Sequence, residues 1–219
     1  METLEKKIND LSAHYNELGR KHGYSPSATQ QSSIETQEKR LNVLLGMISN
    51  LNGKKILDFG CGTGHLLSLL KNNGFNGSYV GYDISTELLK LASQRYPEGR
   101  FELKNILEQP VDESFDWIII SGVFNNDLGC NELFMKQVIT KLFTHAKEGI
   151  VFNALSCYVD YQSPGLYYFD PCWVFNFCKG EITTHVQLKH DYEVKPGVIP
   201  FEFSCLLKKT THKIVKKHE

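Results

Sequence analysis

The stretch Ile56-Leu57-Asp58-Phe59-Gly60-Cys61-Gly62-Thr63-Gly64 sets the interpretation of the whole chain. It begins as a short apolar strand, passes through a glycine-rich turn and opens a leucine-rich helix. Glycine adopts backbone dihedrals that a Cβ forbids, and it lets the main chain approach a ligand closely. The free N–H groups at the start of the helix suit ligand oxygens, so the stretch predicts a nucleotide-like ligand.

Strands and helices alternate around this turn. Strands are expected at 55–59, 78–82, 100–103, 115–121 and 149–153. Helices are expected at 64–72, 86–95 and 132–145. The run Trp117 to Ile120 is apolar throughout, which is typical of a strand covered on both faces. The alternation predicts an α/β fold built on a doubly wound, mostly parallel sheet.

Two further regions flank this core. Residues 1–52 are expected to form an N-terminal helical cap or lid, with helical patterns at 4–15 and 34–48 separated by a polar loop at 19–29. The core is expected at 53–209, with an insertion at about 156–180 that includes a short helix at 171–179. Strands at 182–190 and 201–208 follow, of which one is expected to be antiparallel, and 210–219 form a polar tail.

The spacing of the glycines separates the possible ligand classes. No Walker string Gly-x-x-x-x-Gly-Lys-Ser/Thr occurs in the chain. The dinucleotide fingerprint counted from Gly60 would need a small residue where His65 stands, so an NAD-linked oxidoreductase is disfavoured. The string Asp58-x-Gly60-x-Gly62-x-Gly64 has a tighter spacing, with an acid before the first glycine.

This string resembles the first motif of the class I, Rossmann-like methyltransferases that use S-adenosylmethionine. The resemblance implies that the turn, with Asp58, Gly60, Cys61, Gly62 and Gly64, packs against the methionine part of the cofactor. It also implies that the acid at Asp58 organises the turn and the amino-acid end of the ligand. Further strings resemble a group of small bacterial methyltransferases whose substrates are poorly defined: His14-Tyr15-Asn16, 22–26, 37–41, 152–156, 158–161 and His190-Asp191-Tyr192.

Other cofactor contacts are expected where later strands end. Asp83 follows the second strand near the spacing of about 20 residues typical of a ribose-binding acid, with a plain helix-start acid as the alternative. Ile84 would then lie against the adenine. The resemblance assigns the adenine amino group to the turn of Asn105 and Ile106, and Ser121 is expected beside the transferable methyl group. Arg40 is expected to pair with the cofactor carboxylate, or else to be a solvated helix charge.

The expected reaction is an in-line methyl transfer to oxygen or nitrogen of a small molecule, which leaves S-adenosylhomocysteine. Tyr15, Phe124, Tyr158 and Tyr161 are expected to line the acceptor pocket. The hypothesis for catalysis is that His22 or Tyr24 orients or deprotonates the acceptor. A metal is not expected, because the fifth strand ends without an acidic pair and the six cysteines form no Cys-x-x-Cys motif.

Charge and composition limit the classes of substrate and partner that the sequence predicts. The net charge of −1 argues against nucleic acid as the substrate. The amino-methyltransferases of nucleic acids carry prolines in the segment after the fourth strand, whereas this chain has no proline directly after Phe124. The polar N-terminus and the lack of a long apolar run predict a cytoplasmic protein with no membrane partner. The alternatives are a protein-directed methyltransferase and a catalytically silent cofactor-binding module. The acceptor and the oligomeric state stay open.

Overall fold

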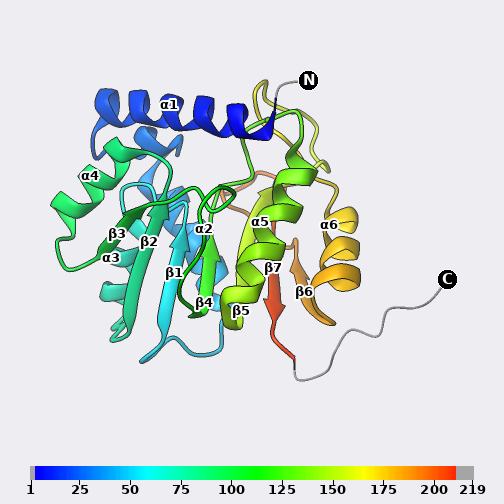
Figure 1. The fold of residues 1–219 in the computed structure, drawn as a ribbon. Coiled ribbons are helices and arrows are strands. Elements are labelled where there is room, and N and C mark those ends of the chain that lie inside the picture. The colour runs from blue at the N-terminus through cyan, green and yellow to red at the C-terminus, as the bar shows by residue number, and fades with distance from the viewer. Residues whose placement is uncertain (1–2, 211–219) are drawn as a thin grey trace.

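The computed structural model describes residues 3–210 (Figure 1). The predicted tail at 210–219 therefore lies outside the described residues, apart from Thr210. In chain order the elements are α1 (Leu4–His22), η1 (Pro26–Thr29), α2 (Ile34–Gly46), β1 (Lys55–Phe59), α3 (His65–Asn72), β2 (Ser78–Asp83), α4 (Thr86–Arg95), β3 (Arg100–Leu103), β4 (Phe115–Ile120), α5 (Asn131–His145), β5 (Ala146–Leu155), α6 (Pro171–Phe177), η2 (Cys178–Ile182), β6 (His185–Lys189) and β7 (Glu202–Lys208).

One mixed sheet organises the chain. Its strand order is β3-β2-β1-β4-β5-β7-β6. The pairs from β3 to β5 are parallel, whereas β7 runs antiparallel to both β5 and β6. The chain order reverses between β1 and β4, which is where parallel α/β sheets open a ligand-binding crevice. The predicted α/β class and the antiparallel strand near the C-terminus are confirmed.

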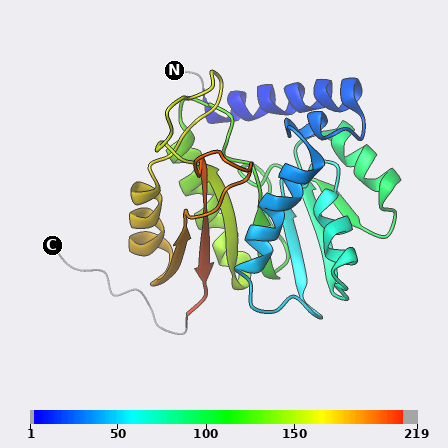
Figure 2. The same cartoon turned by 180° about the vertical axis from the view of Figure 1, so that it is seen from behind.

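Helices cover both faces of the sheet. Helices α2 and α3 pack on one face, seen from behind in Figure 2, and α5 and α6 pack on the other. Helix α1 lies across the edge where the parallel strands end (Figure 1). Within residues 3–210, no helix combines the length and the apolar character needed to cross a bilayer.

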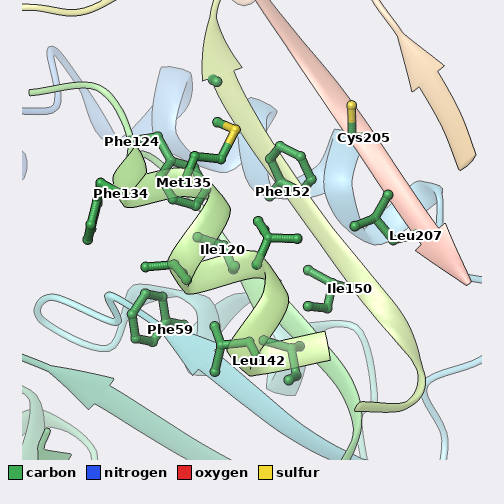
Figure 3. Close-up of a cluster of buried hydrophobic side chains, with 14 of the residues drawn as sticks. Phe59, Ile120, Phe124, Phe134, Met135, Leu142, Ile150, Phe152, Cys205 and Leu207 are labelled. Atoms are coloured by element: carbon green, nitrogen blue, oxygen red, sulfur yellow. The ribbon is translucent and has the colours of Figure 1, made fainter. Parts of the chain in front are cut away.

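The larger core cluster fills the space between α5 and the sheet. Figure 3 shows Phe134, Met135 and Leu142 of α5 facing side chains of the central strands. The predicted double cover of β4 is confirmed, because Trp117 is 2% exposed and Ile118 to Ile120 are fully buried. Their burial explains why this strand carries no alternation of polar and apolar residues.

The first helix ends later in the chain than the sequence predicts. The loop predicted at 19–29 starts later, because α1 continues through Gly19 to His22 and ends at Gly23, where φ is 55°. Gly19 instead marks a close helix crossing, since a Cβ there would lie 3.1 Å from the Cβ of Glu87 on α4. The sequence predicts a loop from this glycine onward, whereas Gly19 lies within α1 and permits its contact with α4.

The core predicts a clear contrast between two leucines of α5. Leu142 is fully buried and Leu133 is 51% exposed. Leu142→Ala is expected to lower the free energy of unfolding by about 2–5 kcal/mol, because it leaves a cavity in a packed core. Leu133→Ala serves as the matched control and is expected to change it by less than about 0.5 kcal/mol. Urea unfolding followed by circular dichroism measures both, and equal losses would contradict the described packing.

Candidate functional site

A cavity lies at the carboxyl ends of β1, β2 and β4, beneath the N-terminal helices; we call it the first cavity. Ligands of parallel α/β sheets bind at this edge. Most of the residues predicted to contact the cofactor line it: Asp58, Gly60, Cys61, Gly62, Asp83, Ile84, Asn105, Ile106 and Ser121. The structure thus brings these residues together, and their contact with a cofactor stays a prediction.

The glycine turn after β1 is packed tightly against two other segments. Gly60 and Gly62 have φ values of 76° and 53°, in the region that favours glycine. A Cβ on Gly60 would lie 2.3 Å from Cγ2 of Val123, and one on Gly62 would lie 2.7 Å from Cγ2 of Thr29. The turn needs glycine both for its dihedrals and for these close approaches.

Asp83 joins the end of β2 to the glycine turn. Its Oδ2 accepts a hydrogen bond from the backbone N–H of Gly62 at 2.8 Å, and its Oδ1 accepts one from that of Ser85 at 2.9 Å. Burial raises the pKa of this carboxyl, and the backbone donors oppose that shift. Asp83 thus lines the cavity and also connects two turns through its hydrogen bonds.

Asp58 lies beneath the same turn. It is 4% exposed, and its Oδ2 accepts a hydrogen bond from the Tyr79 hydroxyl at 2.7 Å. Burial raises the pKa of Asp58 to about 7, with the Tyr79 hydrogen bond acting in the opposite direction. The charge of this carboxyl therefore changes near neutral pH.

The ends of β2 and β3 supply apolar walls. Ile84 and Ile106 line the first cavity, and Ile106 is 1% exposed. The Asn105 side chain closes its own turn, because its Oδ1 accepts a hydrogen bond from the N–H of Leu107 at 3.1 Å. This use of the amide oxygen was not expected from the sequence.

The N-terminal helices close the first cavity from above. Ile8, Leu11 and Tyr15 of α1 line it, which explains the apolar stripe seen in the sequence. The side chain of Asn16 fixes this cover, since its Oδ1 accepts hydrogen bonds from the Ser85 hydroxyl at 2.9 Å and the Glu87 N–H at 3.0 Å. Helix α1 is thereby anchored to the turn that follows Asp83.

A second cavity adjoins the first. Residues of α2, the loop after β4, the insertion and the segment before β7 line it, including Arg40, Asn126, Tyr161, Lys195 and Phe201. Four residues line both cavities: Tyr15, Thr29, Gln31 and Gly122. We call these four the junction. The linings of the two cavities meet at these residues.

Tyr15 is held firmly at the junction. Its hydroxyl donates to Oε1 of Gln30 at 2.9 Å and accepts from Nδ2 of Asn126 at 2.8 Å. Burial raises the pKa of Tyr15 to about 12, so the phenol keeps its proton at neutral pH. Gln30 has a φ of 56°, which is unusual for a residue other than glycine and places its side chain against Tyr15.

Arg40 does not line the first cavity, where it was expected to meet the cofactor carboxylate. Its Nε donates to Oε2 of Glu202 at 2.6 Å, and its Nη1 donates to Oε1 of Gln31. It lines the second cavity instead. The reason is that Glu202, 162 positions later in the sequence, lies on β7 next to α2 and binds Arg40 there.

His22 and Tyr24 line neither cavity. Helix α1 rises about 1.5 Å per residue, so its last turn lies roughly 10 Å beyond Tyr15 along the axis. Tyr24 is 46% exposed, and its hydroxyl donates to Oε1 of Gln94 on α4 at 3.2 Å. The structure brings these two residues to neither cavity, so it gives no support to their predicted part in catalysis.

Three further predicted residues also lie elsewhere. Phe124, expected in the acceptor pocket, is fully buried with its ring against Phe134 and Phe152. Tyr158, expected in the same pocket, is 60% exposed and lines neither cavity. Gly64 begins α3 and faces the side chains of Phe101 and Tyr96 rather than the first cavity. Tyr15 and Tyr161 do line the second cavity.

Sequence reasoning missed several cavity residues. Gln31, Gln37 and Thr29 enter the first cavity from the segment around η1 and α2, and Lys104 enters it from the turn after β3. Polar residues in loops carry no periodic signal, so only the meeting of distant segments reveals them. Within residues 3–210, no group of three His, Cys, Asp or Glu side chains is arranged to hold a metal ion.

Comparisons with known proteins agree with this geometry. Residues 50–196 match a family model described as a methyltransferase domain. A putative methyltransferase from Mycobacterium tuberculosis is 33% identical over 162 residues, which cover 71% of this chain and 93% of that protein. A malonyl-[acyl-carrier protein] O-methyltransferase from Acetivibrio thermocellus is 33% identical over 102 residues, covering 43% of this chain and 36% of that protein.

A solved structure shares the fold. The magnesium protoporphyrin IX methyltransferase of Synechocystis, crystallised with bound SAM, superimposes with a TM-score of 0.65 over 93% of this chain and 97% of that chain. The sequence identity is 14%, so the likeness extends to the architecture alone.

The position of Asp83 predicts a loss of cofactor affinity on substitution. Asp83→Asn is expected to weaken binding of S-adenosylhomocysteine by about tenfold or more, because one backbone N–H would face an amide NH₂ instead of an oxygen. Glu98→Gln, at an exposed acid paired with Lys71, is the control and should leave affinity unchanged. Isothermal calorimetry measures both. Unchanged affinity in a folded Asp83→Asn protein would show that this carboxylate has no part in binding.

The raised pKa of Asp58 predicts a pH-dependent stability. Between about pH 4 and pH 7 the folded carboxyl keeps a proton that the unfolded chain has released, so its contribution to stability falls as the pH rises. Asp58→Asn removes this loss. The variant's free energy of unfolding, relative to the original protein, is expected to rise by roughly 1–4 kcal/mol from about pH 5 to about pH 8. Urea unfolding without cofactor tests this, and a constant difference across that range would contradict it.

Proposed function

The chain belongs to the methyltransferase domain family, and from this premise we propose that it transfers a methyl group from S-adenosylmethionine to a small molecule bound in the second cavity. One observation carries the proposal. The two cavities meet at the junction formed by Tyr15, Thr29, Gln31 and Gly122. A cofactor in the first cavity therefore has a neighbouring space in which an acceptor can lie in line with its methyl group.

The residues of the first cavity fit this cofactor. Gly60 and Gly62 offer a turn without side chains, and a Cβ at either position would collide with its surroundings. Asp83 would accept hydrogen bonds from the ribose hydroxyls, since a carboxylate has more acceptor sites than its two backbone donors occupy. Ile84 and Ile106 would cover the faces of the adenine.

When bound, S-adenosylmethionine supplies an electrophilic methyl group whose leaving group departs as a neutral thioether. The chain's own residues align the acceptor and exclude water, for which no metal is required. Tyr15 would fix the acceptor from above with its anchored phenol ring. Helix α1 would cover the site, as expected if residues 1–52 form a cap on the core at 53–209. The insertion at about 156–180 would form the other wall of the acceptor cavity.

Transfer to oxygen is favoured by the two cationic side chains that line the second cavity, Arg40 and Lys195. The curated relative from Acetivibrio thermocellus is named as an O-methyltransferase. This chain spans 36% of that protein, so the name supports the type of atom and nothing about the acceptor molecule.

Ligand titrations test the proposal directly. S-adenosylhomocysteine is expected to release heat on binding and to raise the melting temperature, because it binds the folded state alone. NAD is the matched control and should do neither, since His65 stands where the dinucleotide fingerprint needs a small residue. The absence of both effects with millimolar S-adenosylhomocysteine would refute the proposal.

Because the proposed transfer needs no metal, turnover in the presence of EDTA should equal turnover without it.

A further inference from the structure

The guanidinium of Arg40 is fixed at the wall of the second cavity. Its Nε and Nη1 are bound by Glu202 and Gln31, and the Phe201 ring lies 5.8 Å from its central carbon. The side chain is 12% exposed. Among residues 3–210 no hydrogen-bond partner is found for the remaining nitrogen, Nη2. A rigid, planar donor is thus held in the wall with one free edge, which suits a carboxylate.

A buried network couples Arg40 to the junction. Glu202, 1% exposed, also accepts hydrogen bonds from Nδ2 of Asn153 at 3.3 Å and from the Tyr192 hydroxyl at 3.2 Å. Oδ1 of Asn153 in turn accepts from the N–H of Gly122 at 2.8 Å. The free edge of Arg40 is therefore held at a defined position relative to Gly122, where the two cavities meet.

A second cation lines the same cavity. Lys195 is exposed, and within the described part of the chain it forms no ion pair. The acidic side chain that lines this cavity is Asp160, which is exposed in the insertion, where water screens its charge. The oxygens of Glu202 are occupied by Arg40, Asn153 and Tyr192. Lys195 is exposed to the same screening, so the largely buried guanidinium of Arg40 is the main donor that an anion in the cavity meets.

The junction supplies no base. Tyr15 is the one titratable residue among the four junction residues, and its phenol keeps its proton at neutral pH. An alcohol acceptor would need a group to take its proton. A carboxylate is already ionised and needs none. The absence of a base among the four junction residues favours an acceptor atom that is nucleophilic without losing a proton.

We propose, on the basis of the function proposed above, that the acceptor is a small carboxylate that Arg40 and Lys195 hold in the second cavity, and that the product is its methyl ester. One carboxylate oxygen binds the two cations, and the other attacks the methyl carbon. An O–C bond forms and the S–C bond breaks, with its electron pair passing to sulfur. No proton moves, and the charges of the sulfonium and the carboxylate disappear together.

Paired probes test this inference. Succinate, phenylacetate and indole-3-acetate are titrated into the protein saturated with S-adenosylhomocysteine, each beside its carboxamide of matched shape. At least one carboxylate is expected to bind about tenfold more tightly than its carboxamide. With S-adenosylmethionine, that carboxylate should yield a methylated product that mild alkali hydrolyses, as it does an ester. Equal binding of all acids and amides, or an alkali-stable product, would overturn the inference.

Substitutions of Arg40 and Lys195 test whether these two side chains bind the carboxylate. Lys195→Met and Arg40→Lys are each expected to weaken carboxylate binding by about tenfold, and Lys195→Met is expected to leave the affinity for S-adenosylhomocysteine unchanged. Arg40→Lys keeps a cation beside Glu202 and removes the free edge of the guanidinium. Lys90→Met, at an exposed lysine of α4, is the matched control and should change neither affinity. Full carboxylate affinity in both Lys195→Met and Arg40→Lys would overturn the inference.

The two proposals can fail separately. If the original protein does not bind S-adenosylhomocysteine, the methyltransferase proposal fails. If it binds S-adenosylhomocysteine and prefers no carboxylate over its amide, the acceptor class alone is wrong. Should Arg40→Lys fail to fold, Lys195→Met and the acid and amide pairs still decide the question.

Discussion

The hydrogen bond from the backbone N–H of Gly62 to the carboxylate of Asp83 is the contact around which the site is built. It joins the turn after β1 to the end of the neighbouring strand, and the other oxygen of Asp83 continues the link to Ser85. Helix α1 then joins at the same place, since Asn16 accepts from the Ser85 hydroxyl. The buried carboxylate thus binds both turns, and α1 is attached to it indirectly through Ser85. Such a tie fixes the glycine turn before any ligand arrives.

Local sequence patterns predicted the parts of the site that lie next to each other in the chain. The glycine string and Asp83 belong to one strand-turn-helix unit and the strand after it, so spacing alone placed them at one edge of the sheet. Most of the expected strands and helices are confirmed for the same reason, because each depends on a short run of residues. The burial of β4 followed from four consecutive apolar side chains.

Long-range partners account for what the sequence could not predict. Arg40 was placed at the cofactor because nothing near it in the chain indicates Glu202. The prediction for His22 and Tyr24 rests on their chemistry, whereas the length of α1 decides which of its residues lie above the cavity. Phe124 follows β4 directly, yet its ring turns into the core between Phe134 and Phe152. In each case the tertiary structure places the side chain at a position that the local sequence does not indicate.

The antiparallel strand β7 has a consequence for the order in which the molecule is assembled. It lies between β5 and β6 in the sheet, although it is the last strand among residues 3–210. During synthesis, β6 therefore emerges before the strand that attaches it to the sheet, and it must wait for residues 202–208. Glu202 arrives with that strand, so Arg40 gains its anchor at the same late step. The glycine turn and Asp83 are made much earlier, so their hydrogen bond can form before Arg40 meets Glu202.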